Sequence, residues 1–183
     1  MSNNQSGTDM AKLYNFEINQ TYKWHAIYSR INHVKTVENE LLEKNIEVYL
    51  PKKRVLHQWS DRKRWVEKPL FRPYLFVHVS NKEYHKVLET PSVCSYICFS
   101  GRAATIPDEQ ISLLKIMIQQ QYDFEIIPNR LHSHQKIKIT EGPLKGFFGE
   151  VVVNKNRNKI QVIIEPFKCA IHFEIDAQSI SPL

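Results

Sequence analysis

The spacing of apolar residues changes once along the chain, near residue 134, and this change limits the possible folds more than any other feature. Up to about residue 120, short aromatic and β-branched runs alternate with segments whose apolar residues recur every three or four positions. Such runs and segments are typical of strands and amphipathic helices. After residue 134, apolar residues recur at alternate positions in four short runs separated by turn residues. The sequence therefore predicts a mixed domain followed by a small all-β domain.

The first part of the chain is predicted to be an antiparallel sheet backed by helices, an α+β domain. Strands are expected over residues 24–28, 46–51, 74–79 and 93–99, and helices over about 34–43, 82–89 and 107–118. The run 74–79 is almost continuously apolar, which is typical of a buried central strand. Pro107 suits the first position of the last helix. The buried side of that helix is expected to hold Ile111, Leu114, Met117 and Ile118.

The domain boundaries follow from the same pattern. Residues 1–21 are predicted to be a flexible N-terminal tail, and residues 22–120 the α+β domain. Three consecutive glutamines, Pro128 and a histidine-rich segment break the pattern over residues 119–134, and we interpret residues 121–134 as a linker. Residues 135–183 are predicted to form a small all-β barrel. We therefore expect two domains joined by a flexible tether.

The composition is that of a folded protein without a membrane-spanning segment. Hydrophobic residues make up 42% of the chain and charged residues 24%, with only five glycines, as in ordinary globular proteins. No segment is apolar over the length that a bilayer requires, and the N-terminus lacks the features of a signal peptide. We therefore expect a cytoplasmic protein, a monomer without membrane association.

Neither the cysteines nor the other polar residues indicate a chemical site. Three cysteines, an odd number, fit a reducing compartment. Cys94 and Cys98 are interspersed with apolar residues, so both are expected in a buried strand rather than at a metal site. The sequence contains no phosphate-binding glycine loop, zinc-protease motif or nucleophile elbow. We therefore expect no catalytic residue, no metal and no cofactor.

Most of the net charge of +6 is concentrated between Pro51 and Lys68, where seven lysines and arginines oppose two carboxylates. Ser60 and Asp61 offer turn chemistry, so this basic arm is predicted to be a β-hairpin. Its cations either protect an exposed edge or contact nucleic-acid phosphates. Its tryptophans either stack on bases or hold the two strands together. The candidate nucleic-acid contacts are Lys52, Lys53, Arg54, Arg62, Lys63 and Arg64.

A glycine-rich segment, residues 141–151, opens the second domain. Its glycines are expected at positions of positive φ, where a barrel strand reverses sharply. Phe147 and Phe148 are adjacent, so they cannot both point inward from an extended strand. One of them is therefore a candidate for a partner surface.

These segments carry a resemblance to a known family. The run Gly-Pro-Leu-Lys-Gly-Phe-Phe-Gly-Glu-Val at 142–151 resembles a KOW motif. Trp24–Tyr28 and Pro69–Val77 resemble the NGN domain of NusG/RfaH-type transcription elongation factors, and the whole is most similar to the UpxY-like antiterminators of capsular polysaccharide operons. The resemblance implies a ferredoxin- or RNP-like NGN domain followed by an SH3-like KOW barrel. The implied KOW residues are Gly142, Lys145, Gly146, Phe147, Phe148, Gly149 and Val151.

The resemblance also implies partners. In this family the NGN domain binds the β′ clamp helices of RNA polymerase and reaches the β gate loop. His85 falls where a gate-loop motif begins, followed here by Lys86 and Val87 instead of two threonines. Rho or a ribosomal protein is the implied partner of the KOW domain, and non-template or upstream DNA is a further partner. The implied contacts are Tyr28, Phe71, Tyr74 and Phe76 for the clamp helices, and Arg30 and Lys35 for DNA.

The resemblance thus implies a non-enzymatic factor that increases the processivity of RNA polymerase on long operons. A ribosome- or RNA-binding protein is the alternative, since KOW barrels also occur in ribosomal proteins and the chain is basic. The first half of the chain discriminates between the two, because a ribosomal protein has no need of an NGN-like domain.

Overall fold

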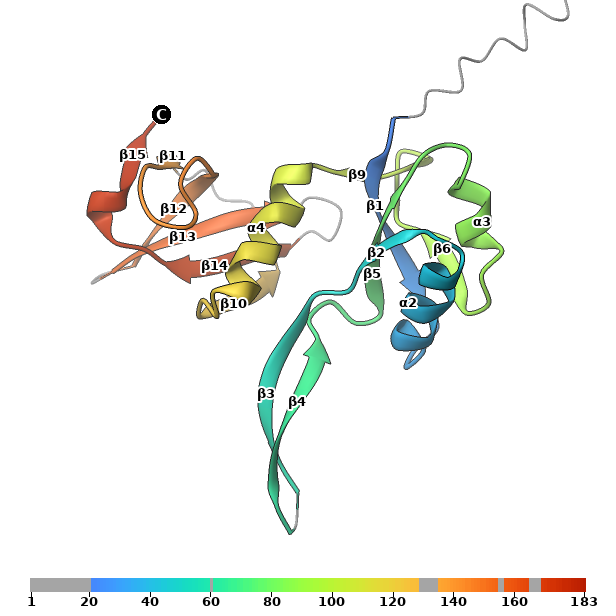
Figure 1. Cartoon of the computed structure of the whole chain (residues 1–183). Helices are drawn as coiled ribbons and strands as arrows, with labels where there is room; N and C mark the ends of the chain where they lie inside the picture. Colours follow the sequence, from blue (N-terminus) through green and yellow to red (C-terminus); the bar gives the residue numbers. More distant parts are fainter. Residues whose placement is uncertain (1–20, 60, 129–134, 155–156, 165–168) are drawn as a thin grey trace, which may run out of the picture.

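The computed structural model describes residues 21–59, 61–128, 135–154, 157–164 and 169–183. It contains few helices and many strands, arranged as two antiparallel sheets with a helix between them and a long hairpin that projects away from both (Figure 1). The predicted N-terminal tail, residues 1–21, lies outside the described residues except for its last position. The mixed α/β character expected for the first part of the chain is confirmed.

The N-terminal sheet is antiparallel and has the strand order β2-β5-β1-β6. Its strands are β1 (Lys23–Ser29), β2 (Glu47–Tyr49), β5 (Tyr74–Val79) and β6 (Val93–Tyr96). A short strand, β9 (Thr105–Ile106), also pairs with β1. Strand β5 lies between two neighbours, as its apolar composition predicted. Because side chains alternate between the two faces of a strand, the sheet has two different apolar faces.

One face of this sheet is covered by helices α2 (Val34–Glu43) and α3 (Tyr84–Leu88). Ile27, Leu75 and Val77 on the sheet are fully buried in one cluster with Val37 and Leu41 of α2. The apolar stripe of α2 that the sequence predicted is therefore the side that packs on the sheet. The opposite face of the sheet is the one that carries the aromatic residues.

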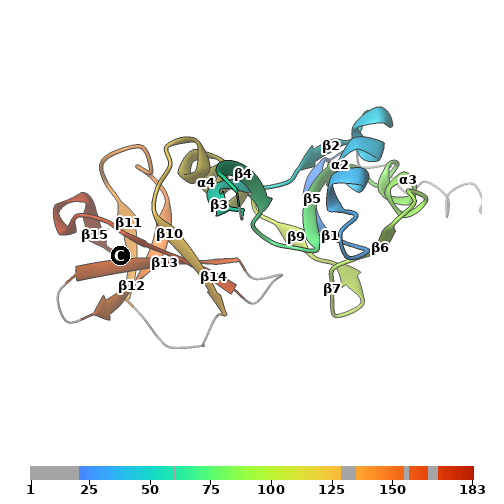
Figure 2. The same ribbon diagram turned by 90° about the horizontal axis from the view of Figure 1, so that it is seen from below.

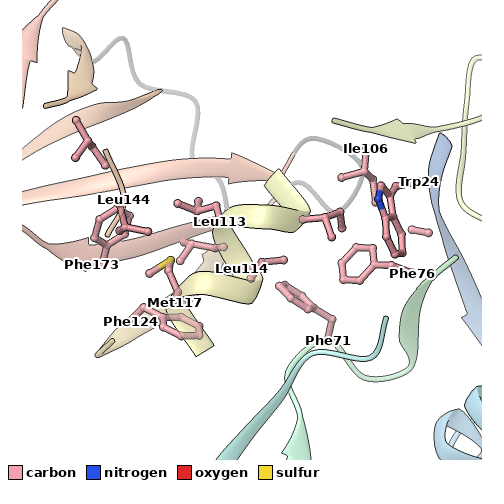
Figure 3. Packing of buried hydrophobic residues seen from close by; sticks show 14 of the residues in the cluster. Trp24, Phe71, Phe76, Ile106, Leu113, Leu114, Met117, Phe124, Leu144 and Phe173 are labelled. Atoms are coloured by element: carbon pink, nitrogen blue, oxygen red, sulfur yellow. The ribbon is translucent and has the colours of Figure 1, made fainter. Parts of the chain in front are cut away.

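Helix α4 (Asp108–Gln119) lies between the two sheets and is buried on two sides. Figure 3 shows Trp24, Phe71 and Phe76 on one side of the helix and Leu144 and Phe173 on the other. Leu113, which the predicted buried side omitted, is 1% exposed, because it faces this second partner. Pro107 caps the helix with extended backbone (φ −57°, ψ 140°) and lies one position before the helix, not at its first position.

The C-terminal sheet has six antiparallel strands in the order β10-β14-β13-β12-β11-β15 and curls along its length (Figure 2). It buries Ile137, Ile139 and Phe173 against the α4 side. A short 3-10 turn (Ala177–Ser179) precedes its last strand. The strands are β10 (Phe124–Pro128), β11 (Gln135–Ile139), β12 (Phe148–Asn154), β13 (Arg157–Ile164), β14 (Cys169–Glu174) and β15 (Ile180–Pro182).

Strand β10 corrects the predicted linker. Residues 124–128 pair with β14, starting with Phe124 opposite Phe173, so the linker prediction is wrong over this stretch. Phe124 is buried and Ile126 packs against the same cluster, which is the alternation of a half-buried strand. Residues 129–134 of the predicted linker lie outside the described residues.

Two hairpins leave the N-terminal sheet. The basic arm forms the predicted hairpin, in which β3 (Lys52–Gln58) pairs with β4 (Lys63–Pro69). A second, shorter hairpin joins β7 (Cys98–Phe99) to β8 (Arg102–Ala103). The strand predicted over residues 93–99 is therefore interrupted, and Cys94 and Cys98 are exposed rather than buried. Among the described residues, no helix has the length and apolar character needed to cross a membrane.

Candidate functional site: an aromatic face and a basic hairpin

The second face of the N-terminal sheet is built from aromatic residues on neighbouring strands. Tyr28 pairs with Tyr74, and Ala26 pairs with Phe76. Directly paired residues lie on the same face of a sheet, and residues two apart along a strand share that face. The alternation of β1 and β5 therefore gathers these side chains into one aromatic face, together with Trp24 at its far end.

Helix α4 covers the half of this face that contains Phe71, Phe76 and Trp24 (Figure 3). The rings of Phe71 and Phe76 meet edge to face, with centroids 5.8 Å apart, and the two side chains are 7% and 0% exposed. The ammonium of Lys115 on α4 lies 5.0 Å from the ring centroid of Trp24 and 5.3 Å from that of Tyr49. Such cation–π contacts hold the helix on the sheet. Burial raises the pKa of the Tyr49 phenol, which keeps it neutral.

The other half of the aromatic face is not covered by α4. Tyr28 and Tyr74 are half-buried there, and their rings meet at 65° with centroids 5.4 Å apart. The turn that leads into β5 is fixed by Ser29, whose backbone N–H and hydroxyl both donate to the carbonyl of Pro73, at 3.1 and 2.9 Å. Tyr28 and Tyr74 therefore form a rigid, partly accessible aromatic pair, the tyrosine pair.

The structure thus brings together four of the five residues predicted to contact a protein partner. Tyr28 and Tyr74 lie at the accessible surface, and Phe71 and Phe76 lie beneath α4 next to them. His85 lies elsewhere: it is exposed on α3, which covers the opposite face of the sheet, with its ring 5.7 Å from that of Tyr84. A single partner surface does not include all five.

Sequence reasoning missed one exposed aromatic residue near this region. Phe99 is 74% exposed at the end of β7, and the β7–β8 hairpin leaves the sheet directly after Ile97, whose N–H donates to the carbonyl of Ala26 at 2.8 Å. The signal for this hairpin was the dipeptide Ser100-Gly101, which marks a turn. Both residues have positive φ, at 49° and 78°.

The basic hairpin has two faces with different chemistry, because side chains of a β-strand alternate and paired residues share a face. We call them the tryptophan face and the arginine face. The tryptophan face consists of Lys52, Arg54, Leu56, Gln58, Lys63, Trp65 and Glu67. The arginine face consists of Lys53, Val55, His57, Arg64, Val66 and Lys68. Trp59 at the tip lies against His57, with ring centroids 5.8 Å apart.

Two of the predicted nucleic-acid contacts form ion pairs with the rest of the protein. Lys52 Nζ lies 2.7 Å from a carboxylate oxygen of Glu38, and Lys53 Nζ lies 3.5 Å from Asp123. The Lys52–Glu38 pair is partly buried, whereas the carboxylate of Asp123 is fully exposed, so the first pair contributes more to holding the base of the hairpin. Farther out, Arg62 is 3.9 Å from its neighbour Asp61. Within the described residues, no carboxylate lies within 4.0 Å of the charged groups of Arg54, Lys63, Arg64 and Lys68.

The remaining two basic candidates are not on the hairpin. Arg30 follows β1 directly, and its N–H donates to the carbonyl of Ser92 at 2.9 Å. Lys35 lies in the first turn of α2. Both side chains are exposed. The structure therefore separates the predicted nucleic-acid contacts into a hairpin set and a pair at the β1–α2 connection.

The glycine-rich turn before β12 has the predicted positive φ at two of its three glycines, whereas Gly149 lies within the strand without a positive φ. Gly142 and Gly146 have φ values of 76° and 94°, and Gly146 N–H donates to the carbonyl of Ile139 at 2.8 Å. Phe147 packs against the core cluster, whereas Phe148 is 57% exposed, so the two adjacent rings diverge as expected. Lys145 is exposed, and Gly149 and Val151 lie within β12. A groove of about 850 Å³ runs between this turn and the start of α4.

Comparison with known proteins assigns the chain to a family. A family model described as NusG, transcription termination factor nusG, matches residues 22–115, which is more than half of the chain. The chain belongs to the NusG family. The match contains the aromatic face and the basic hairpin and ends within α4, so the C-terminal sheet lies outside it. Members of the NusG family are transcription factors, not enzymes.

The chain is also similar to individual proteins. The transcription termination/antitermination protein NusG of Haemophilus influenzae is 24% identical over 134 residues, covering 71% of this chain and 72% of that protein. A solved structure of Thermotoga maritima NusG, described as showing domain interaction, has a TM-score of 0.48 at 16% identity and covers 88% of this chain and 97% of the other. The MjSpt4:Spt5 complex in conformation B has a TM-score of 0.29 at 16% identity, covering 87% and 96%.

The part of this NusG-family chain that the structure describes offers no metal site. No group of three or more histidine, cysteine, aspartate or glutamate side chains converges within those ranges. The residues that do converge are aromatic or basic. Aromatic and basic side chains gathered at a surface are suited to binding another macromolecule.

Proposed function

We propose that this chain is a transcription elongation and antitermination factor that docks on RNA polymerase through its N-terminal domain. In this proposal residues 22–120 are an NGN domain and residues 135–183 a KOW domain, to whose sheet strand β10 is added. The NGN domain binds the β′ clamp helices, and the factor raises processivity on long operons, those of polysaccharide biosynthesis in particular. The observation that carries the proposal is the tyrosine pair, a partly accessible aromatic surface on a rigid sheet within the segment that matches the NusG family.

The tyrosine pair has the properties of an interface anchor. A few aromatic residues in a patch that loses its water on binding carry most of the affinity of many interfaces. Tyrosine is well suited to this because its ring is apolar and its hydroxyl stays available for hydrogen bonding. Tyr28 and Tyr74 pair across the β1–β5 ladder and their rings pack against each other, so less side-chain freedom is lost on binding.

Phe71 and Phe76 have a supporting role in this proposal. Both are buried beneath α4, so a partner that meets the protein in this conformation contacts the tyrosine pair and not the two phenylalanines. Their edge-to-face packing forms the floor under Tyr74, which packs against the same cluster. Substituting them therefore changes polymerase binding through the shape of the patch.

Contacts with both halves of the mobile polymerase clamp would reduce pausing by shifting the clamp toward its closed state. His85 on α3 is proposed to meet the β gate loop, on the side of the sheet away from the tyrosine pair. A protein that binds both sides of a cleft favours the closed state by its differential affinity for that state. Because pausing needs the clamp to open, closure raises processivity without any chemical step.

The basic hairpin and the C-terminal domain supply further contacts in the proposal. The cations of the hairpin, with Arg30 and Lys35, attract upstream or non-template DNA through its phosphates, which supplies affinity without sequence information. Phe148, exposed on the glycine-rich turn, is the proposed contact of the KOW domain with Rho or a ribosomal protein. The protein is proposed to act in the cytoplasm, as a monomer.

The test is binding to core RNA polymerase by the full chain and by the double variant Tyr28→Ala/Tyr74→Ala. We expect the double variant to lose at least about thirtyfold in affinity, since loss of even one anchor residue costs about 2 kcal/mol or more. Tyr22→Ala is the matched control, because Tyr22 is an exposed tyrosine near the other end of β1, and it should bind like wild type. Unchanged affinity of the double variant would refute the docking surface.

A transcription assay completes the test. The wild-type chain should increase read-through of terminators on a long template, and the double variant should not. If the chain instead bound ribosomes or structured RNA tightly and polymerase not at all, the ribosome- or RNA-binding alternative would replace this proposal.

A further inference from the structure

The basic hairpin exposes an apolar pair that its folding does not explain. Leu56 and Trp65 lie opposite each other in the middle of the hairpin and are 51% and 58% exposed. Cross-strand pairs stabilise a hairpin, but the pair Val55–Val66 on the arginine face already supplies such a contact. A large aromatic ring half in water, on an element that projects from the protein, is suited to contact with a ligand.

The guanidinium of Arg54 contacts Trp65 rather than Glu67, its cross-strand neighbour. Arg54 pairs with Glu67 in the ladder, yet its guanidinium lies over the ring of Trp65, 6.0 Å from the centroid, and forms no ion pair with Glu67 within 4.0 Å. A separation of 6.0 Å is at the long limit of a cation–π contact. The guanidinium is therefore free to turn toward an anion without breaking a strong interaction.

A groove continues from this face toward the body of the protein. Between the base of the hairpin and the end of α4 lies a groove of about 430 Å³. Arg54, Trp65 and Tyr122 line it together with the carboxylate of Glu67. Lys52 and Lys53 also line it but form ion pairs with Glu38 and Asp123, and Phe124 is buried with Lys53 over its ring. Cations that follow a groove together with aromatic rings on which bases stack are the combination found in proteins that bind single-stranded nucleic acid.

We propose that the tryptophan face of the hairpin binds single-stranded DNA, with an unpaired base stacked on Trp65 and the adjacent phosphates near Arg54 and Lys63. An unpaired base is required because the faces of bases in a duplex are covered by their neighbours. The choice of DNA over RNA rests on the proposed function, which places this hairpin beside DNA that polymerase has opened. The arginine face, which carries Arg64 and Lys68 without a carboxylate, remains available for phosphates of duplex DNA.

The test uses the full chain without polymerase, a labelled oligothymidine of about 12 nucleotides, and fluorescence anisotropy at several salt concentrations. Single-strand sites commonly span about 4 to 16 nucleotides. Trp65→Leu keeps an apolar contact with Leu56 but removes the aromatic face, so we expect oligothymidine affinity to fall at least about tenfold. Trp65→Phe retains a ring and should remain within about threefold of wild type.

Trp59→Leu is the matched control. Trp59 is 52% exposed, close to the 58% of Trp65, but lies at the tip against His57, so its replacement should leave oligothymidine affinity within about twofold. Affinity for a duplex of the same length should be unchanged by Trp65→Leu. An oligouridine of the same length is measured beside the oligothymidine. Three outcomes would overturn the proposal: no binding of oligothymidine by the wild-type chain, equal losses at Trp59 and Trp65, or a Trp65 effect confined to oligouridine.

The result is separable from the test of the proposed function. Trp65→Leu leaves the tyrosine pair intact, so this variant should still bind core polymerase like wild type. Loss of oligothymidine binding with polymerase binding retained would support this inference. A wild-type chain that binds oligothymidine through Trp65 but does not bind polymerase would contradict the proposed function and not the stacking site.

Discussion

The aromatic residues of the N-terminal sheet and those of the basic hairpin belong to the same chemical class and lie in opposite surroundings. Phe76 is 0% exposed beneath α4, whereas Trp65 is 58% exposed on the hairpin. The two surroundings differ because helix α4 covers the half of the aromatic face that contains Phe76. Among the described residues, no helix or sheet covers the outer part of the basic hairpin (Figure 1). Aromatic composition therefore does not by itself separate a core from a binding surface.

The two regions also differ in how much apolar surface remains available for binding. A buried ring already makes its contacts within the protein, so it contributes no binding free energy to a partner unless the helix that covers it moves away. A half-exposed ring has apolar area left to bury, at about 25 cal/mol for each Å² removed from water. The tyrosine pair lies between these extremes, which is why the polymerase-docking proposal rests on it rather than on Phe71 and Phe76.

The largest effect that we expect is on the free energy of unfolding, which should fall much more for a substitution under α4 than for one on the hairpin. Phe76→Ala should lower the free energy of unfolding by about 3–5 kcal/mol, because it leaves a cavity between the sheet and α4. Trp65→Ala should cost less than about 1 kcal/mol, because a ring on an exposed hairpin leaves no cavity. Urea unfolding followed by far-ultraviolet circular dichroism measures both. Similar losses for the two variants would show that the hairpin is part of the cooperative core.

A smaller effect is expected for the cations that lie over the rings of each region. Lys115 lies over Trp24 and Tyr49 on the covered face, and Arg54 lies over Trp65 on the exposed hairpin. Lys115→Met keeps most of the side-chain length and removes the charge, so it should cost about 0.5–1 kcal/mol. Arg54→Met should cost less than about 0.5 kcal/mol, since its contact is longer and in water.

The same unfolding measurement checks this pair, with Lys35→Met on α2 as the control for loss of an exposed helical lysine. An equal cost for Lys115→Met and Lys35→Met would mean that the cation over the aromatic face contributes nothing to holding α4.

The sequence was sufficient for features that depend on local pattern. The hairpin of the basic arm, the central position of β5 and the positive φ of Gly142 follow from alternation, apolar runs and turn residues. The divergence of Phe147 and Phe148 follows from the period of a strand alone.

The sequence was not sufficient where a residue's surroundings depend on a distant segment. Contacts between distant segments determine three features: the burial of α4 on two sides, the pairing of β10 with β14, and the exposure of Cys94. For the same reason the aromatic motif of residues 69–77 did not reveal that Phe71 and Phe76 lie beneath a helix. The candidate site was thus predictable in its residue types and not in which of them reach the surface.

The smallest expected effect concerns two histidines that make the same contacts in different surroundings. The Nδ1 of His25 lies 3.0 Å from the carbonyl oxygen of Ala104, and that of His57 lies 3.2 Å from the carbonyl of Gln58. Because a carbonyl only accepts, Nδ1 of His25 carries a proton. Burial lowers the pKa of His25 below its usual 6.5. The hydrogen bond to Ala104 raises the pKa, and the nearby charges of Lys23 and His78 lower it by smaller amounts.

The lowered pKa has a definite consequence for stability. Below pH 6.5 the unfolded chain binds a proton at His25 more readily than the folded chain does, so the free energy of unfolding falls as pH decreases through this range and is fully retained above it. His25→Asn keeps a donor near the Ala104 carbonyl and removes the titration. The urea midpoint of this variant should therefore change less between about pH 7.5 and about pH 5 than that of wild type. His57→Asn, an exposed matched substitution, should follow the wild-type profile. If the profile of His25→Asn were as steep as that of wild type, the loss of stability in acid would have another origin than the burial of His25.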